Sequence, residues 1–104
     1  MDEKIKSIIK EIIANTGISV ENIVFFGSRA RGDADPDSDY DIILITSKTL
    51  KNKDRLILTK AVRTALAKLL IPADVLVLSK SEVDARRSVP GSIIRNALKE
   101  GISV

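Results

Sequence analysis

Two short apolar runs separated by a polar segment constrain the fold of this chain more than any other feature. The runs are Ile23-Val24-Phe25-Phe26 and Ile42-Ile43-Leu44-Ile45, and each is bounded by Gly, Asp or Ser. Runs of this length, rich in β-branched and aromatic residues, are typical of β-strands. The sequence therefore predicts strands over 22–26 and 39–46. The polar segment between them is a connection of the kind that often carries binding and catalytic groups.

Apolar residues at helical spacing predict helices on either side of these strands. A helix over 2–15 ends before Gly17, and a longer helix over about 53–70 ends before Pro72, because proline disfavours the helical conformation in the residue before it. The residues expected on the buried faces are Ile5, Ile8, Ile9, Ile12 and Ile13 in the first helix and Leu58, Val62, Ala65, Leu66 and Leu69 in the second.

The C-terminal third predicts one more strand and two more helices. The strand covers 73–78, and a short helix over 81–87 is capped by Ser79 or Ser81. The residues that mark the buried face of a last helix, closed by Gly101, are Ile93, Ile94, Ala97 and Leu98. The order α-β-β-α-β-α-α predicts an α/β (α+β) fold, in which helices cover a small mixed sheet.

Length and composition narrow the class of protein. With 104 residues, of which 44% are hydrophobic, we expect a single domain over 1–104. The chain has no cysteine and no histidine, which excludes disulfides, thiolate nucleophiles, the usual zinc sites and histidine acid–base chemistry. The absence of disulfides fits a cytoplasmic protein.

The distribution of charged and apolar residues along the chain bears on membrane and nucleic-acid partners. The N-terminus begins with acidic residues and does not resemble a signal peptide, and no apolar run approaches the roughly 18 residues that a membrane span needs. The net charge is +3, the basic residues are spread through the chain, and only one Tyr and two Phe are present. This pattern argues against membrane and nucleic-acid partners.

Two carboxylates at the head of the second predicted strand indicate a metal site. Residues two apart on a strand point to the same face about 6.6 Å apart, so Asp39 and Asp41 project together while Tyr40 points into the core. Carboxylates at this spacing can each reach a divalent cation, and magnesium typically binds through one or two carboxylates plus substrate phosphates. The pattern therefore favours a magnesium site that takes a triphosphate.

The turn after the first predicted strand has the composition of a phosphate-binding segment. Gly27 lets the backbone approach a ligand closely, and the hydroxyl of Ser28 can donate a hydrogen bond to a phosphate oxygen. Arg29 and Arg31 can contact phosphate or hold the acidic loop.

A third carboxylate stands at the start of the third predicted strand. The rest of this predicted strand is apolar, and Asp74 joins Asp39 and Asp41 if its strand lies beside theirs. Two metal ions roughly 3.5–4 Å apart could then be held. Because histidine is absent, Asp74 is also the natural proton acceptor from an attacking hydroxyl.

The spacing of these motifs resembles one known family. A Gly-Ser pair, ten intervening residues, an Asp-x-Asp and a later Asp resemble the nucleotidyltransferase superfamily that contains DNA polymerase beta. The run Gly27-Ser28-Arg29-Ala30-Arg31-Gly32, followed by Ser38-Asp39-Tyr40-Asp41, is similar to its small prokaryotic branch, the minimal nucleotidyltransferases of the MNT type. The resemblance covers nearly the whole chain and implies a polymerase beta-like nucleotidyltransferase core.

The resemblance implies an activity and its residues. Asp39, Asp41 and Asp74 would bind two Mg²⁺ ions, while Gly27 and Ser28 would hold the triphosphate of ATP or another NTP. A nucleoside monophosphate would pass to a hydroxyl with loss of pyrophosphate. Members of the branch are often antitoxins paired with an all-helical HEPN-type toxin, and some modify a tyrosine of that partner with AMP. A homo-oligomer is also compatible with the sequence.

Simpler interpretations of the same residues stay open. The alternating acids from Asp33 could suggest a calcium loop, but Ser38 and Leu44 stand where an EF-hand requires Gly and Glu. The Asp-x-Asp and Asp74 could be exposed residues at strand entries. The residues that could form structural ion pairs are Arg29 and Arg31, with Asp35 or Asp37.

Two other functions also remain as hypotheses. The chain could be a non-catalytic, antitoxin-like module that neutralises a helical partner. It could also modify nucleic acid, which the weak clustering of basic residues disfavours.

Overall fold

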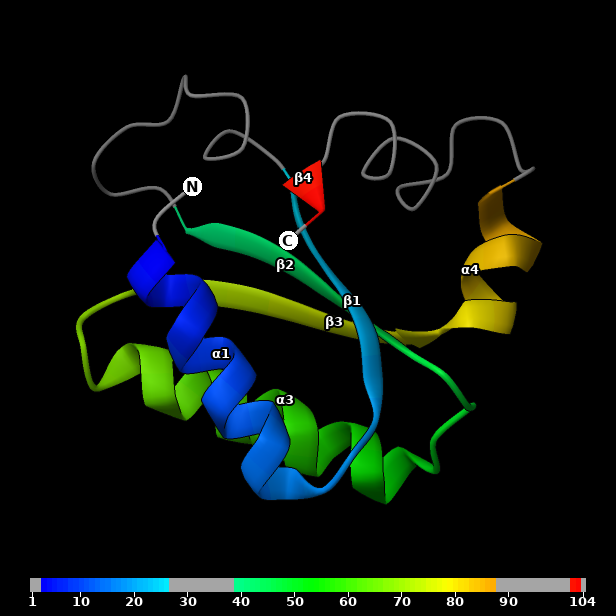
Figure 1. Cartoon of the computed structure of the whole chain (residues 1–104), viewed down its shortest axis with the longest axis horizontal. Helices are drawn as coiled ribbons and strands as arrows, with labels where there is room; N and C mark the ends of the chain where they lie inside the picture. The colour runs from blue at the N-terminus through cyan, green and yellow to red at the C-terminus, as the bar shows by residue number, and fades with distance from the viewer. Residues whose placement is uncertain (1–2, 27–38, 88–101, 104) are drawn as a thin grey trace.

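The computed structural model describes residues 3–26, 39–87 and 102–103 (Figure 1). Its elements are α1 (Glu3–Thr16), β1 (Val20–Phe26), β2 (Tyr40–Thr46), α3 (Asn52–Ala67), β3 (Ala73–Ser79), α4 (Lys80–Arg87) and β4 (Ile102–Ser103). The strands form one mixed sheet in the order β3-β2-β1-β4. Strand β1 is antiparallel to both β2 and β4, whereas β2 and β3 are parallel and joined through α3. The predicted α+β class is confirmed.

Helices α1 and α3 cover one face of the sheet (Figure 1). Alternate residues of β2 point toward these helices, as the period of two in a strand requires. Tyr40 is one of them and meets the ring of Phe25 edge-on, with ring centroids 6.3 Å apart. The buried residues of this core are Ile5, Ile9, Ile13, Ile23, Phe25, Ile42, Leu44, Leu58, Val62, Leu66 and Val77.

Helix α4 packs on the opposite face, at the end of the sheet where β2 and β3 finish (Figure 1). Its Val83 completes a second, smaller apolar cluster, whose other members are Val24, Ile43, Ile45 and Leu78. At the other end of this face, where β2 and β3 begin, none of the described helices covers the strands.

The turn from α3 into β3 fixes where β3 begins. Leu70 N–H donates to the carbonyl of Ala67 and Ile71 N–H to that of Leu66, both at 2.9 Å. This is the Schellman pattern, and Leu70 occupies its left-handed position with φ of 60°. The half-buried Ile71 packs back onto the core. The chain then passes through Pro72 into β3.

Most predicted elements are confirmed, with ends that differ by three residues or fewer. Gly17 ends α1 in the left-handed conformation that glycine favours, with φ of 73°. The prediction of a buried Leu69 is wrong, because α3 ends at Ala67 and leaves Leu69 47% exposed. Strand β4 was not predicted. The predicted last helix, marked by Ile93, Ile94, Ala97 and Leu98, lies outside the described residues.

Candidate active site

Two of the predicted acids lie opposite each other on neighbouring strands. Asp41 of β2 and Asp74 of β3 are register partners in the parallel pair. Neighbouring strands lie about 4.8 Å apart, and paired residues point to the same face. That face is the one opposite α1 and α3, because Tyr40 and Ala73, the preceding residues, pack toward the core. The condition that the sequence analysis attached to Asp74 is therefore met.

The third predicted acid lies at the same end of the sheet. Tyr40 N–H donates to the carbonyl of Pro72 at 3.0 Å, which brings the start of β2 beside the start of β3. Asp39 directly precedes Tyr40 and is exposed, as is Asp74, while Asp41 is half-buried. All three carboxylates thus lie at or directly before the starts of two parallel strands.

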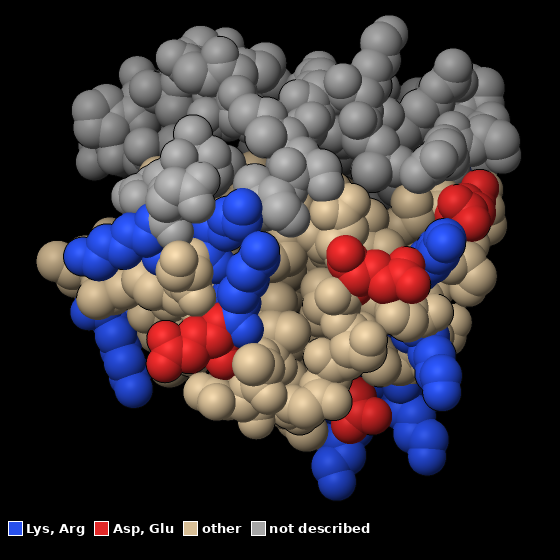
Figure 2. Space-filling model, viewed as in Figure 1, with Lys and Arg blue, Asp and Glu red and all other residues tan. Residues whose placement is uncertain are grey.

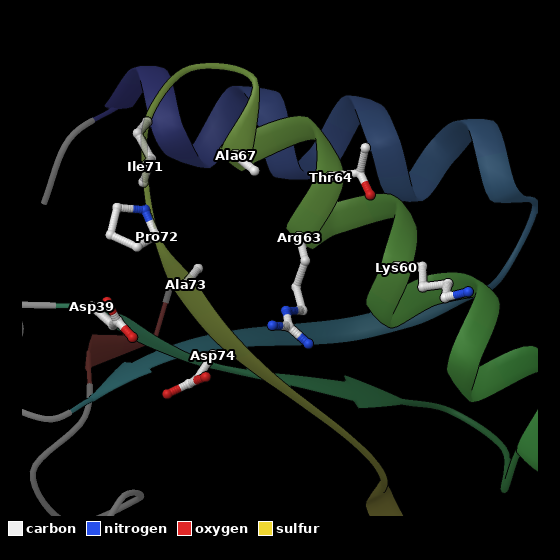
Figure 3. A pocket seen from close by; sticks show the side chains of 9 residues that line it. All are labelled: Asp39, Lys60, Arg63, Thr64, Ala67, Ile71, Pro72, Ala73 and Asp74. Atoms are coloured by element: carbon white, nitrogen blue, oxygen red, sulfur yellow. The ribbon is translucent and has the colours of Figure 1, made fainter.

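These strand ends border an open cavity of about 370 Å³ (Figure 3). Arg63 extends from α3 toward the start of β3, and Lys60 lies about one helical turn before Arg63 in the same helix (Figure 3). The residues that line the cavity are Asp39, Lys60, Arg63, Thr64, Ala67, Ile71, Pro72, Ala73 and Asp74. The cavity therefore combines two carboxylates with two cations.

The donor chemistry at this end of the sheet suits magnesium, which prefers carboxylate oxygens. As the side chains stand, however, no group of three or more acids among the described residues is arranged to hold a metal ion. The paired positions of Asp41 and Asp74 bring two of the three predicted ligands to adjacent backbone sites.

The predicted phosphate-binding residues Gly27, Ser28, Arg29 and Arg31 lie outside the described residues. The strand that leads into them is described. Phe26, the last residue of β1, is the register partner of Asp41. The chain thus enters the Gly-Ser segment at the end of the sheet where the acids lie.

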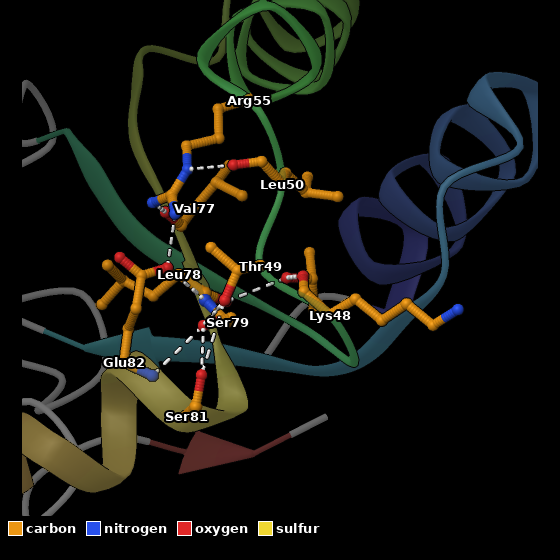
Figure 4. Close-up of polar contacts among 10 residues, drawn as sticks. Lys48, Thr49, Leu50, Arg55, Val77, Leu78, Ser79, Ser81 and Glu82 are labelled. Atoms are coloured by element: carbon orange, nitrogen blue, oxygen red, sulfur yellow. Dashed lines mark hydrogen bonds and ion pairs between the residues drawn. The ribbon is translucent and has the colours of Figure 1, made fainter.

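A polar cluster at the opposite end of the sheet has a structural role (Figure 4). Ser79 and Glu82 form a reciprocal capping box at the start of α4: Glu82 N–H donates to Ser79 Oγ at 3.1 Å, and Ser79 N–H donates to Glu82 Oε1 at 3.0 Å. This confirms Ser79 as the predicted cap. Arg55 joins α3 to the cluster through Glu82 Oε1 and the carbonyls of Leu50 and Val77.

The hydrogen bonds of this cluster favour the ionised form of Glu82. The hydrogen bond from Arg55 is the largest cause and lowers the pKa of Glu82 from 4.5 to about 2, although partial burial of the carboxylate opposes it. The N–H of Ser79 lowers the pKa further. Glu82 is thus held as a carboxylate that ties α3, β3 and α4 together.

The sequence did not identify Lys60, Arg63 and Thr64 as candidate site residues. Their spacing marks one side of the predicted helix, but only the turn through Pro72 brings that side to the cavity that Asp74 lines.

On the face seen in Figure 2, basic side chains lie among acidic and uncharged ones rather than in one continuous patch. None of the described helices is long and apolar enough to cross a membrane.

The model of the family described as Polymerase beta, Nucleotidyltransferase matches residues 3–104. The chain belongs to this family. The polymerase beta-like core expected from the sequence is therefore confirmed.

Among curated proteins, this chain is 37% identical over 57 residues to a "Putative protein adenylyltransferase" of Methanocaldococcus jannaschii. The match covers 53% of the chain and 58% of that relative, so the chain spans little more than half of the relative's length.

Two solved structures share the fold. One is described as a toxin–antitoxin with AMP-PNP; it has a TM-score of 0.64 and 21% identity, over 93% of this chain and 69% of the other. The other is described as a tri-AMPylated Shewanella oneidensis HEPN toxin in complex with MNT antitoxin. It has a TM-score of 0.58 and 18% identity, over 99% and 71% of the two chains.

Proposed function

We propose that this nucleotidyltransferase transfers AMP from ATP to a hydroxyl group on a protein partner and releases pyrophosphate. The observation that carries the proposal is the register of Asp41 opposite Asp74, with Asp39 directly before β2 at the same end of the sheet. The adenylyltransferase name of the Methanocaldococcus jannaschii relative favours AMP as the transferred group and a protein as the acceptor.

In this proposal the nucleotide lies at the end of β1 and β2. Gly27 and Ser28 follow β1 directly and would hold the triphosphate through backbone N–H groups and a hydroxyl. Arg29 and Arg31 would contact phosphate oxygens. A site built this way works by positioning and charge neutralisation, which is what nucleotidyl transfer chiefly needs.

Asp39, Asp41 and Asp74 would hold Mg²⁺, with two ions the expected number. When bound, magnesium neutralises charge on the triphosphate. Asp74 accepts the proton of the acceptor hydroxyl. The hydroxyl oxygen then bonds to the α-phosphorus, while the bond from that phosphorus to the bridging oxygen of the β-phosphate breaks and pyrophosphate leaves.

The proposed partner is a helical protein of the HEPN type, for which the chain would act as the antitoxin. The support is the likeness to the toxin–antitoxin structures, one of which contains an AMPylated HEPN toxin.

The test is to co-purify the chain with the product of its neighbouring gene and to incubate the complex with ATP and magnesium. Mass spectrometry should show that the partner gains the mass of one AMP or more. A stable complex without any gain in mass would favour the alternative, a non-catalytic module that neutralises its partner by binding.

A further inference from the structure

The cavity beside Asp74 is lined by two cationic side chains that have no role in the proposed transfer of AMP. Lys60 and Arg63 line it from α3, together with the hydroxyl of Thr64. Within the described part of the chain, neither cation takes part in an ion pair or a side-chain hydrogen bond. By contrast, Arg55 on the same helix is bonded to a carboxylate and two carbonyls. Lys60 and Arg63 are therefore available to bind an anion.

The order of the strands indicates which substrate approaches through this cavity. In the proposed function, from which this step follows, the pyrophosphate leaves toward the segment that follows β1. In-line displacement puts the attacking oxygen on the opposite side of the phosphorus from the leaving oxygen. Strands β1 and β3 flank β2 on opposite sides. The acceptor hydroxyl therefore arrives from the β3 side, where the cavity lies.

The cavity has one end suited to a hydroxyl and another suited to an anion. Asp74 lies at the end near the other acids, and Asp39 lies beside it (Figure 3). Arg63 lies on the α3 side, and Lys60 is one helical turn further from Asp74 (Figure 3). Because Asp74 points to the face opposite α3 and β3 is the edge strand, a segment whose hydroxyl donates its proton to Asp74 would pass around that edge and bring its neighbouring groups toward the two cations. An anion there gains charge-assisted hydrogen bonds.

A peptide fits the cavity better than a nucleic-acid strand does. Single-stranded nucleic acids bind through aromatic stacking and an extended basic track. None of the residues that line the cavity is aromatic, and Asp39 and Asp74 interrupt its positive charge. A short segment with one or two anionic groups matches this mixed lining, whereas a polyanion does not.

We propose that Lys60 and Arg63 select the acceptor: a protein segment that carries an anionic group, a carboxylate or a phosphate, next to the hydroxyl that receives AMP. Thr64 contributes a further hydrogen bond to that group. Arg63 and Lys60 are specificity-determining residues in this assignment and take no part in binding ATP.

Three fluorescent tyrosine peptides test this proposal: one flanked by Glu, one by phosphoserine and one by Gln. Binding is measured by fluorescence anisotropy without ATP, in wild type and in the double variant Lys60→Gln/Arg63→Gln. We expect wild type to bind at least one anionic peptide about tenfold more tightly than the Gln peptide, and the double variant to lose this preference. The stronger of the two anionic peptides identifies carboxylate or phosphate as the preferred group.

The matched control is Lys10→Gln/Lys53→Gln, which removes two exposed cations outside the cavity and should keep the preference. Transfer assays add a second readout: the double variant should raise the KM for the preferred peptide about tenfold and leave the KM for ATP unchanged. Equal binding of the three peptides, or a preference that survives in the double variant, would overturn the proposal. A raised KM for ATP alone, or displacement of the peptides by an oligonucleotide, would also overturn it.

Failure of this step and failure of the proposed function give different results. The anisotropy measurement needs neither ATP nor transfer, so it reports on Lys60 and Arg63 alone. The catalytic proposal fails instead if Asp41→Asn still transfers AMP, whatever the peptide preference.

Discussion

Asp41 and Asp74 face each other across the parallel strands β2 and β3, so two carboxylates occupy directly opposed positions on one face of the sheet. Like charges opposed across a strand pair destabilise a sheet. A divalent cation bound to both carboxylates would offset such repulsion.

The first prediction follows from this repulsion. Replacing Asp74 by Asn should raise the free energy of unfolding by about 0.5 kcal/mol in the absence of metal, because one of the opposed charges is removed. Urea denaturation at neutral pH measures the change. Asp84→Asn, an exposed acid on α4, is the matched control and should leave stability unaltered. A clear loss of stability in Asp74→Asn would show that the carboxylate has a structural role.

Magnesium should make wild type more stable than Asp74→Asn, which reverses the order expected without metal. A ligand that binds only the folded state stabilises it by mass action, and a hundredfold excess over the dissociation constant contributes about 2.7 kcal/mol. We expect magnesium with ATP to raise the Tm of wild type by at least about 5 °C, and the chelator EDTA to remove the magnesium-dependent part of this increase. The variants Asp41→Asn and Asp74→Asn should lose most of the magnesium-dependent part. An equal response in wild type and both variants would contradict the proposed metal ligands.

Leu70 offers a change that should stabilise the fold without affecting the site. Its φ of 60° lies in the left-handed region, and its side chain is 90% exposed, so packing gives little in return for the strain. Leu70→Gly should raise the free energy of unfolding by about 0.5–1 kcal/mol, as measured by urea denaturation. The control Leu69→Gly should lower the free energy of unfolding, because Leu69 does not have a left-handed backbone. Destabilisation by Leu70→Gly would mean that the exposed side chain makes a contact of its own.

The lowered pKa of Glu82 predicts a stability that depends on acid. Because its folded pKa of about 2 lies below the ordinary 4.5, its contribution is fully present above pH 4.5 and is lost as the pH falls toward 2. Glu82→Gln should therefore cost about 2 kcal/mol at pH 7 and almost nothing near pH 2. Thermal unfolding of wild type and variant across this range measures the difference. The same substitution at the exposed Glu21 is the control, and a gap between wild type and Glu82→Gln that is constant with pH would reject the assignment.

Local patterns in the sequence were enough to predict much of this fold. The Ile repeat of α1, the apolar runs of β1 and β2, and the serine before α4 each act within a few residues. Their structures follow from periodicity and capping. The helical pattern failed at Leu69, because apolar spacing continued past the point where the Schellman turn at Leu70 ends α3. Strand β4 has only two residues, which is too short for any pattern.

The candidate site was predictable only in part, because its residues meet through tertiary structure. The sequence identified Asp74 as a candidate, but its register opposite Asp41 depends on how α3 returns the chain to β3. The same return brings Arg63 and Asp74 to the lining of one cavity, and no motif in the sequence marks that arrangement. The roles of Gly27 and Ser28 stay predictions.

The most direct test of the account is transfer of labelled AMP from ATP by wild type and by Asp41→Asn, with thermal unfolding of both proteins and with Asp84→Asn as the control. We predict that wild type and Asp84→Asn label the partner, while Asp41→Asn loses at least about a hundredfold in transfer rate and unfolds within a few degrees of wild type. Labelling by a folded Asp41→Asn at the wild-type rate would contradict the assignment of these carboxylates as the catalytic centre.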